Sequence, residues 1–278
     1  MKKALCVLLA LAVLGGAAFA QAASYKESPV LADLVKAGKI PTVDKRIPKD
    51  VLVVKPTEKV GKFGGTWRMA FRPISAWSLW AYVLKENEIR YAEDFKTLIP
   101  SLFKSFQASP DNKVFTFTLR QGIKWNDGDD YDADDYVFWW EDIVNNADLA
   151  PSKPSEFLAG GKLPKFEKID RYTIRFTFDV SYSTFLHRLA QPRYSSSNTG
   201  PLARPSHYLK QFHPKYAAKA DIDKAVKDGG FNTWMDMFNA KANSVSNPAV
   251  PVLCAWRNLD INTGRSEERR VGKECRSR

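Results

Sequence analysis

Apolar and polar residues alternate clearly in two stretches of the chain. Between residues 115 and 119 the odd-numbered positions are Phe, Phe and Leu, and Thr stands between them. Between residues 172 and 178 the even-numbered positions are Tyr, Ile, Phe and Phe, again with polar residues at the positions between them. A period of two predicts a strand with one buried face. We therefore expect two half-buried strands in this region.

The segment between these strands predicts a tight turn region followed by a helix. Gln121-Gly122 and residues 126–128 (Asn-Asp-Gly) indicate turns on either side of a short strand at 123–125. A helix is expected over 134–145, because Asp134 and Asp135 can cap free N–H groups and oppose the helix dipole. Its apolar stripe is Val137, Trp140, Ile143 and Val144, so of the adjacent pair Trp139 and Trp140 we expect one inside and one at the surface.

Weaker patterns place the other elements. Apolar spacing predicts a helix near 31–37, a strand near Tyr91, a helix with Leu98, Leu102 and Phe106 inward, a short helix at 185–189, and helices at 205–212 and 221–239, the last broken at Gly229-Gly230. Some strands are thus separated by helices. This order indicates a mixed α/β or α+β globular region.

The residues of the turn region also carry a resemblance. Thr-Leu-Arg, Gly-Ile-Lys-Trp, Asp-Gly and Ala-Asp-Asp follow one another between 118 and 135, just before the predicted helix. This order and spacing resemble the family 5 solute-binding proteins of bacterial ABC importers, typified by dipeptide- and oligopeptide-binding proteins. Segments 98–106 and 169–176 also lie where that family has similar segments, and the resemblance covers about residues 24–260.

The resemblance implies a fold and a function. The fold would be the α/β, periplasmic-binding-protein-like type II (two-lobe) fold, with only the first lobe substantially present in residues 24–264, because this sequence ends about where such a chain crosses to its second lobe. The function would be that of a monomeric, non-enzymatic receptor without cofactor or metal. Peptides are the expected ligands, oligosaccharides the alternative, and a membrane permease the partner. Because ligand contacts come from both lobes, we expect this fragment alone to bind weakly or not at all.

The resemblance also suggests ligand-contacting residues. In the family, the loop after the first core strand faces the cleft, and here that loop holds Arg72, Trp77 and Ser78. A second polar loop holds Tyr194 and Ser195. Aromatic planes with polar neighbours suit peptide side chains and sugar rings alike.

A rival class of function is a secreted glycoside hydrolase or other hydrolase. It would use the acidic cluster Asp127, Asp129, Asp130, Asp132, Asp134, Asp135 and Glu141. The same cluster has part of the spacing of a calcium loop, but the position that requires Gly is Asp135. Helix capping and a solvated turn are the preferred interpretation. His187, His207 and His213 are expected to be surface or packing residues, since no nucleophile elbow accompanies them.

The two ends of the chain change what the net charge and the cysteine count imply. Residues 1–23 have the charged start, apolar run and Ala18-Phe-Ala20 site of a signal peptide, with cleavage expected after Ala20 and a periplasmic destination; an uncleaved anchor is the alternative. Residues 265–278 resemble a translated sequencing adapter, and we expect this tail to be an assembly artefact. Without the tail (net +3) and the signal (+2), the formal charge of +11 falls to +6, so nucleic-acid binding loses its support. Cys254 alone then remains, expected as a small buried hydrophobe.

Overall fold

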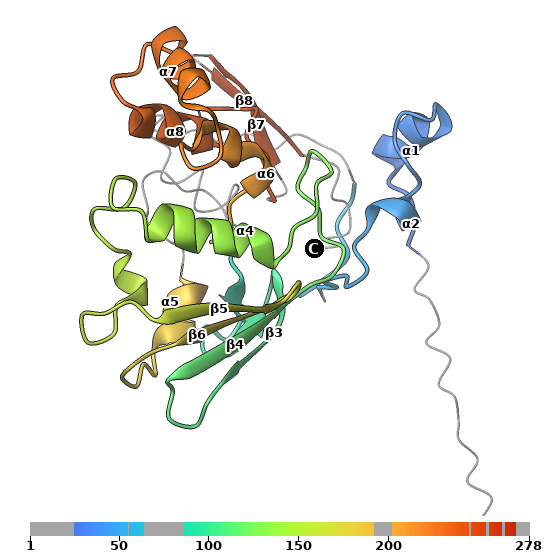
Figure 1. Ribbon diagram of the computed structural model, residues 1–278. Coiled ribbons are helices and arrows are strands. Elements are labelled where there is room, and N and C mark those ends of the chain that lie inside the picture. The colour runs from blue at the N-terminus through green and yellow to red at the C-terminus, as the bar shows by residue number, and fades with distance from the viewer. Residues whose placement is uncertain are drawn as a thin grey trace, which may run out of the picture.

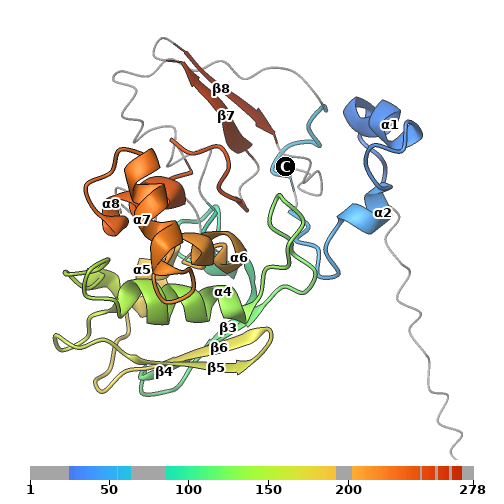
Figure 2. The ribbon, with the colours of Figure 1, turned by 45° about the horizontal axis from the view of Figure 1, so that its top comes forward.

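The computed structural model describes residues 25–54, 56–63, 86–191, 202–244 and 246–253, and the backbone of 256–262 and 265–270. Its elements form layers, with a four-stranded sheet at the base, a helix lying across it, and a group of short helices beyond (Figures 1 and 2). In chain order they are α1 (Pro29–Lys36), α2 (Val43–Arg46), β1 (Ile89–Tyr91), β2 (Leu98–Pro100), β3 (Phe103–Ala108), β4 (Val114–Leu119), α4 (Ala133–Val137), the π-helix η1 (Phe138–Val144), the 3₁₀ turn η2 (Ser155–Phe157), β5 (Lys165–Asp170), β6 (Thr173–Thr177), α5 (Phe185–Ala190), α6 (Ser206–Leu209), the 3₁₀ turn η3 (Lys210–Phe212), α7 (Lys219–Asp228), α8 (Trp234–Ala242), β7 (Trp256–Asn262) and β8 (Arg265–Arg270).

The main sheet is antiparallel throughout, in the order β3-β4-β6-β5. The two strands predicted from alternation are its central pair, β4 and β6. Phe115, Phe117, Leu119, Ile174 and Phe176 are all buried on one face, and the positions between them are half-buried. The period-two prediction is confirmed in both strands.

The prediction of a helix around residues 98–106 is wrong. This stretch forms β2, which pairs with β1 through Ile89 opposite Pro100, and β3, which is an edge strand of the main sheet. Pro100 has no N–H and disfavours a helix interior. The apparent helical spacing has another cause, because β3 changes register between Phe103 and Ser105 and so interrupts the period of a strand.

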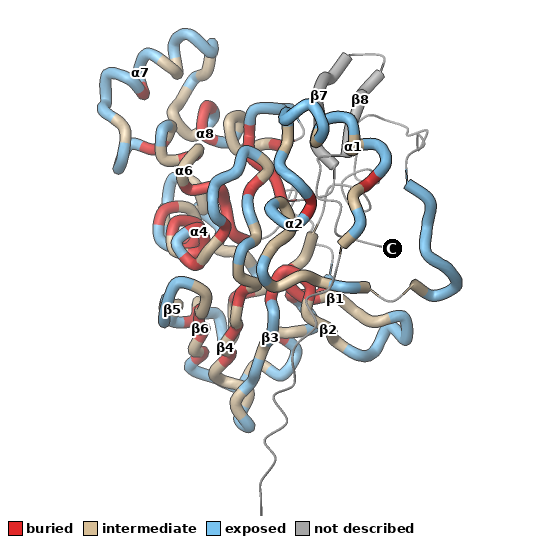
Figure 3. The backbone as a smooth tube through the Cα atoms, turned by 90° about the vertical axis from the view of Figure 1, so that its right-hand side faces the viewer, coloured by how far each residue is buried: buried red, intermediate tan, exposed pale blue. Residues whose placement is uncertain are grey.

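The predicted helix after the turn region is present, with two differences. It begins at Ala133 because Asp132 is its N-cap and accepts a hydrogen bond from the Asp134 N–H at 2.9 Å. Its second half is the π-helix η1, and both Trp139 and Trp140 are buried, so the prediction of one inside and one outside is wrong. The helix lies between the sheet and the helices α6 and α8 and therefore buries side chains on two sides (Figures 1 and 3).

The helix packs against an apolar cluster on each of these two sides. The larger lies between the sheet and one side of the helix, where Trp140, Phe157 and Phe185 pack around Phe176 with ring centroids 5.3 to 5.9 Å from it. The smaller joins Phe138, on the other side of the helix, to α6 and α8. Predicted helices 185–189, 205–212 and 221–239 are confirmed as α5, α6 with η3, and the pair α7 and α8. Together they fix the helical layer on the sheet.

The N-terminal arm, residues 25–63, contacts this body at a turn. Asp50 N–H donates to the Gln121 carbonyl at 3.1 Å, and the Gln121 N–H donates to the Asp50 carboxylate at 3.1 Å. Gly122, at φ +81°, approaches so closely that an added Cβ would lie 2.7 Å from Lys49 N. The helices α1 and α2 stand away from the sheet (Figure 2). Among the described residues, this arm holds five exposed large apolar side chains: Val30, Leu34, Val53, Val60 and Phe63.

Beyond residue 253 the backbone forms a hairpin in which β7 and β8 are antiparallel. Residues 265–270 of the tail that we predict to be foreign thus form a strand. The strand does not test where the tail comes from, so its foreign origin stays a prediction. Cys254 lies outside the described residues, as does the signal sequence. No helix in the described ranges has the length and apolar character required to span a membrane.

Candidate functional site

The five residues predicted to contact ligand lie outside the described residues and remain predictions. Arg72, Trp77 and Ser78 belong to 64–85, and Tyr194 and Ser195 belong to 192–201.

The described residues that flank those two segments are bonded to one another. Asn87, which follows the first segment closely, donates from Nδ2 to the carbonyls of Ala190 and Gln191, at 3.1 and 3.3 Å, just before the second segment. Glu88 accepts a hydrogen bond from the N–H of Leu202, just after it. The C-terminal end of the first segment and the residues on both sides of the second segment therefore lie side by side.

Glu88 was missed by sequence reasoning. It is fully buried next to β1, and its carboxylate also accepts from the Tyr136 hydroxyl at 3.4 Å, which in turn bonds the hydroxyl of Tyr131. A buried carboxylate is costly unless it is hydrogen-bonded, and these donors offset that cost. No motif or periodicity marks this residue, since these two partners come from distant parts of the chain.

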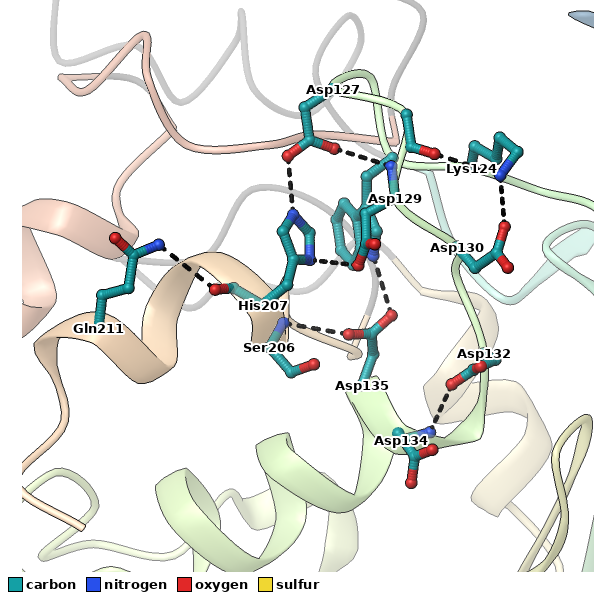
Figure 4. A network of polar contacts seen from close by, with 12 residues as sticks. Lys124, Asp127, Asp129, Asp130, Asp132, Asp134, Asp135, Ser206, His207 and Gln211 are labelled. Atoms are coloured by element: carbon teal, nitrogen blue, oxygen red, sulfur yellow. Dashed lines mark hydrogen bonds and ion pairs between the residues drawn. The ribbon is translucent and has the colours of Figure 1, made fainter. Parts of the chain in front are cut away.

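The acidic cluster, the other candidate for chemistry, lies where the turn region meets α6 (Figure 4). His207 stands between two carboxylates, with Nε2 2.7 Å from Asp127 Oδ2 and Nδ1 2.9 Å from Asp129 Oδ2. The second contact is an ion-pair distance but is poorly aligned for a hydrogen bond. The Trp125 ring lies beside the imidazole, with centroids 6.4 Å apart. No local pattern pairs His207 with Asp127, eighty positions earlier, or with its neighbour Asp129.

Asp135 is a buried member of the cluster. Its two oxygens accept from Trp125 Nε1 at 2.9 Å and from the Ser206 N–H at 3.0 Å. Burial raises the pKa of its carboxyl to about 6, and those hydrogen bonds only partly oppose the effect. Asp135 thus joins the turn region to α6 from inside, whereas the sequence had placed it in an exposed helix cap.

The remaining carboxylates are ion-paired or capping. Arg171 contacts Asp130 and Asp132 at 2.8 Å each, and Lys168 contacts Asp134 at 2.6 Å. Hydrogen bonds from Lys124 and Arg171 lower the pKa of Asp130. Glu141 lies farther along, on η1, and accepts from Asn145 at 3.4 Å. Within the described ranges no three His, Cys, Asp or Glu residues are arranged to hold a metal ion. Asp132 caps the helix, in agreement with the capping interpretation, whereas ion pairs and the buried Asp135 connect the turn region to other elements, which that interpretation did not include.

The other two histidines lie apart from this cluster. His213 is buried among the rings of Phe138, Trp234 and Phe238, with centroids 5.4 to 6.3 Å away. Its Nδ1 accepts from the Lys215 N–H at 3.2 Å, so Nε2 carries the proton and donates to the Asp142 carbonyl at 3.2 Å. Desolvation lowers the pKa of this imidazole. His187 bonds and stacks on Tyr91. Packing, the role predicted for the histidines, describes His213.

Residues 97–247 match the family model described as "Bacterial extracellular solute-binding proteins, family 5 Middle". The chain is 30% identical over 253 residues to the periplasmic alpha-galactoside-binding protein of Rhizobium meliloti (strain 1021), a match that covers 84% of this chain and 34% of that protein. It is 34% identical over 107 residues to the dipeptide-binding protein of Escherichia coli (strain K12), covering 34% of this chain and 20% of that protein.

Two solved structures resemble the fold over most of its length. An oligopeptide-binding protein OppA is 39% identical, with a TM-score of 0.79, over 90% of this chain and 38% of that one. The periplasmic binding protein MelB from Agrobacterium fabrum C58, in complex with stachyose, is 29% identical, with a TM-score of 0.67, over 89% of this chain and 37% of that one. The three matches that cover most of this chain thus cover only about a third of the length of the proteins that it resembles.

Proposed function

Because the chain belongs to the bacterial extracellular solute-binding proteins of family 5, we propose that it is part of the ligand-binding receptor of an ABC importer. Its relatives are substrate-binding proteins and not enzymes, and the fold it shares with them is that of type II periplasmic binding proteins. The observation that carries the proposal is the extent of this likeness, since nine-tenths of the chain superposes on a protein named as an oligopeptide-binding protein. The acidic cluster supports it as well, because its carboxylates are occupied by structural partners.

Peptides are the proposed ligands, in keeping with the OppA likeness and with the dipeptide-binding relative. An oligosaccharide is the second candidate. It is favoured by two relatives that match most of the chain and whose names mention an alpha-galactoside and stachyose. Trp77, proposed to contact ligand, suits either class, because an aromatic plane packs against apolar side chains and sugar rings.

The described residues contribute a scaffold to this function. Asn87 and Glu88, at the C-terminal end of the segment that holds Arg72, Trp77 and Ser78, bond the residues on both sides of the segment that holds Tyr194 and Ser195. The second segment is therefore fixed at both ends, and a loop fixed in this way loses less conformational entropy when it closes on a ligand. In the proposed mechanism, ligand stabilises the closed arrangement of two lobes over the open one, and the closed form docks on the permease.

The organisation of the chain is part of the proposal. Residues 1–23 act as a signal peptide cleaved after Ala20, residues 24–264 form a partial first lobe, and residues 265–278 are foreign. The exported receptor is a periplasmic monomer that binds no nucleic acid. Mapping raw sequencing reads across the Gly264–Arg265 junction tests the foreign tail. Reads that continue through residue 278 into one uninterrupted gene would contradict it.

The experiment for the function is calorimetric titration of the uninterrupted gene product with short peptides and, separately, with stachyose. Saturable binding of one class, with a Kd on the order of micromolar, is expected. Trp77→Ala should weaken it, whereas the matched change at an exposed aromatic of the described surface, Tyr216→Ala, should leave it unchanged. Release of cleavage products from either ligand would favour the hydrolase alternative instead.

A further inference from the structure

Three segments distant in sequence meet at the acidic cluster. The turn at Asn126 binds the segment before β7 twice, since its N–H donates to the Val252 carbonyl at 3.1 Å and its side-chain oxygen accepts from the Val252 N–H at 2.6 Å. The same turn reaches α6 through Asp127 and Asp129, which flank His207. Val252 and Leu253 are buried at this junction. The contacts between the turn and α6 therefore also fix residues 250–253, because Asn126 of the same turn is hydrogen-bonded to Val252.

The contact between the turn and α6 depends on the charge of one imidazole. A protonated imidazole donates from Nε2 to Asp127, and its positive charge also attracts Asp129 beside Nδ1. A neutral imidazole has a single donor, so its other nitrogen presents a lone pair to a carboxylate oxygen less than 3 Å away. Loss of the proton thus turns one attraction into a repulsion.

We propose that His207, Asp127 and Asp129 form a proton-operated clasp that fixes residues 250–253 against the turn when His207 is charged and loosens them when it is neutral. The geometry carries this proposal, because two carboxylates from one turn converge on one imidazole of another element. The side chains of Val250, Val252 and Leu253 carry no charge, so this segment responds through Asn126.

Other charged groups of the described residues face the clasp and act differently. Asp135 lies behind Trp125 and is held by the Ser206 N–H, so its protonation weakens a bond to α6 as pH falls, the opposite of the clasp. Lys124 pairs with Asp130 at 2.5 Å, on the outer side of the turn. On α6 itself, Gln211 bonds the His207 backbone and carries no charge.

In a two-lobed receptor of the proposed kind, this segment is the root of the crossing to the second lobe, and that part of the inference rests on the proposed function. The pH outside the cell would then determine how firmly the clasp holds residues 250–253, from which the chain continues to the second lobe, against the first lobe. The clasp itself requires no ligand, so it can be tested without one.

The test is amide hydrogen exchange of the 278-residue chain at about pH 5.5 and about pH 8, with protection factors corrected for intrinsic exchange. The Val252 N–H should lose roughly tenfold in protection at the higher pH, the scale of one charge-assisted hydrogen bond. His207→Gln should remove this difference, because glutamine keeps a donor but cannot titrate. His187→Gln, a matched change at the histidine that bonds Tyr91, should keep it.

Two further arms keep the outcome decisive. Asp127→Asn with Asp129→Asn should also abolish the difference, which covers the case in which the His207 variant does not fold, and Asp135→Asn should preserve it. Slow amide exchange in β4, a central strand of the main sheet, shows that each variant is folded. Equal protection of Val252 at both pH values in the unmodified chain, or an unchanged pH effect in His207→Gln, would overturn the clasp. Neither result depends on whether the protein binds peptides.

Discussion

Asp135→Asn is a sharp test of how this fold uses a buried carboxylate. Burial raises the pKa of Asp135 from 3.8 to about 6, so the folded state binds its proton more tightly than the unfolded state. Stability from this group therefore increases as pH falls through 6 and is fully gained below 3.8. The shift of about two units corresponds to about 3 kcal/mol in total, of which about 1.4 kcal/mol appears between about pH 7.5 and about pH 5. Asparagine has nearly the same shape and does not titrate.

The assay is urea unfolding of the unmodified chain and of Asp135→Asn at those two pH values, followed by tryptophan fluorescence. The difference in unfolding free energy should move in favour of the unmodified chain by about 1.4 kcal/mol at the lower pH. Asp33→Asn, at an exposed position of α1, controls for the loss of a carboxylate without burial. A difference that stays constant, or that moves in favour of the asparagine variant on acidification, would refute the reasoning.

Three other changes test single contacts. Burial lowers the pKa of His213, so its stabilising contribution is full above the unfolded value near 6.5 and is lost on acidification; His213→Gln should flatten the fall in melting temperature between about pH 7 and about pH 5. Gly122→Ala should cost about 1–3 kcal/mol and speed exchange of the Asp50 amide, while Gly161→Ala, also at positive φ but in open space, should cost less in urea unfolding. Glu88→Leu should cost about 1–3 kcal/mol in the same assay because the Leu202 N–H loses its acceptor, and a loss equal to that of Glu88→Gln would contradict this.

The parts of the fold that could be predicted are those specified locally. Alternation from 115 to 119 and from 172 to 178 predicts β4 and β6, because each strand buries one face and shows a period of two. Gly229-Gly230 likewise marks the end of α7, where Gly230 adopts φ +67°. The error at 98–106 arose because a bulge shifts the phase of β3, and only its pairing with β4 reveals that.

The candidate site depended on contacts that no local pattern encodes. Asp135 looks like an ordinary residue of an acidic first turn, and its burial against Trp125 and α6 is seen only in the structure. Glu88 is bonded to a residue 114 positions later. Likewise, the burial of both Trp139 and Trp140 required knowing that Phe157 packs against both rings on the side of η1 that faces the sheet. A resemblance at 118–135 identified the family, whereas the physical roles of these residues needed the structure.

The central claim is that this chain is part of a receptor for peptides or oligosaccharides, and calorimetric titration of the uninterrupted gene product tests it most directly. The account predicts saturable, stoichiometric binding of a short peptide or of stachyose, with the ligand recovered intact, and weak or no binding by the 278-residue chain alone. Cleavage of the ligand, or tight binding of peptide by the isolated 278-residue chain, would contradict it.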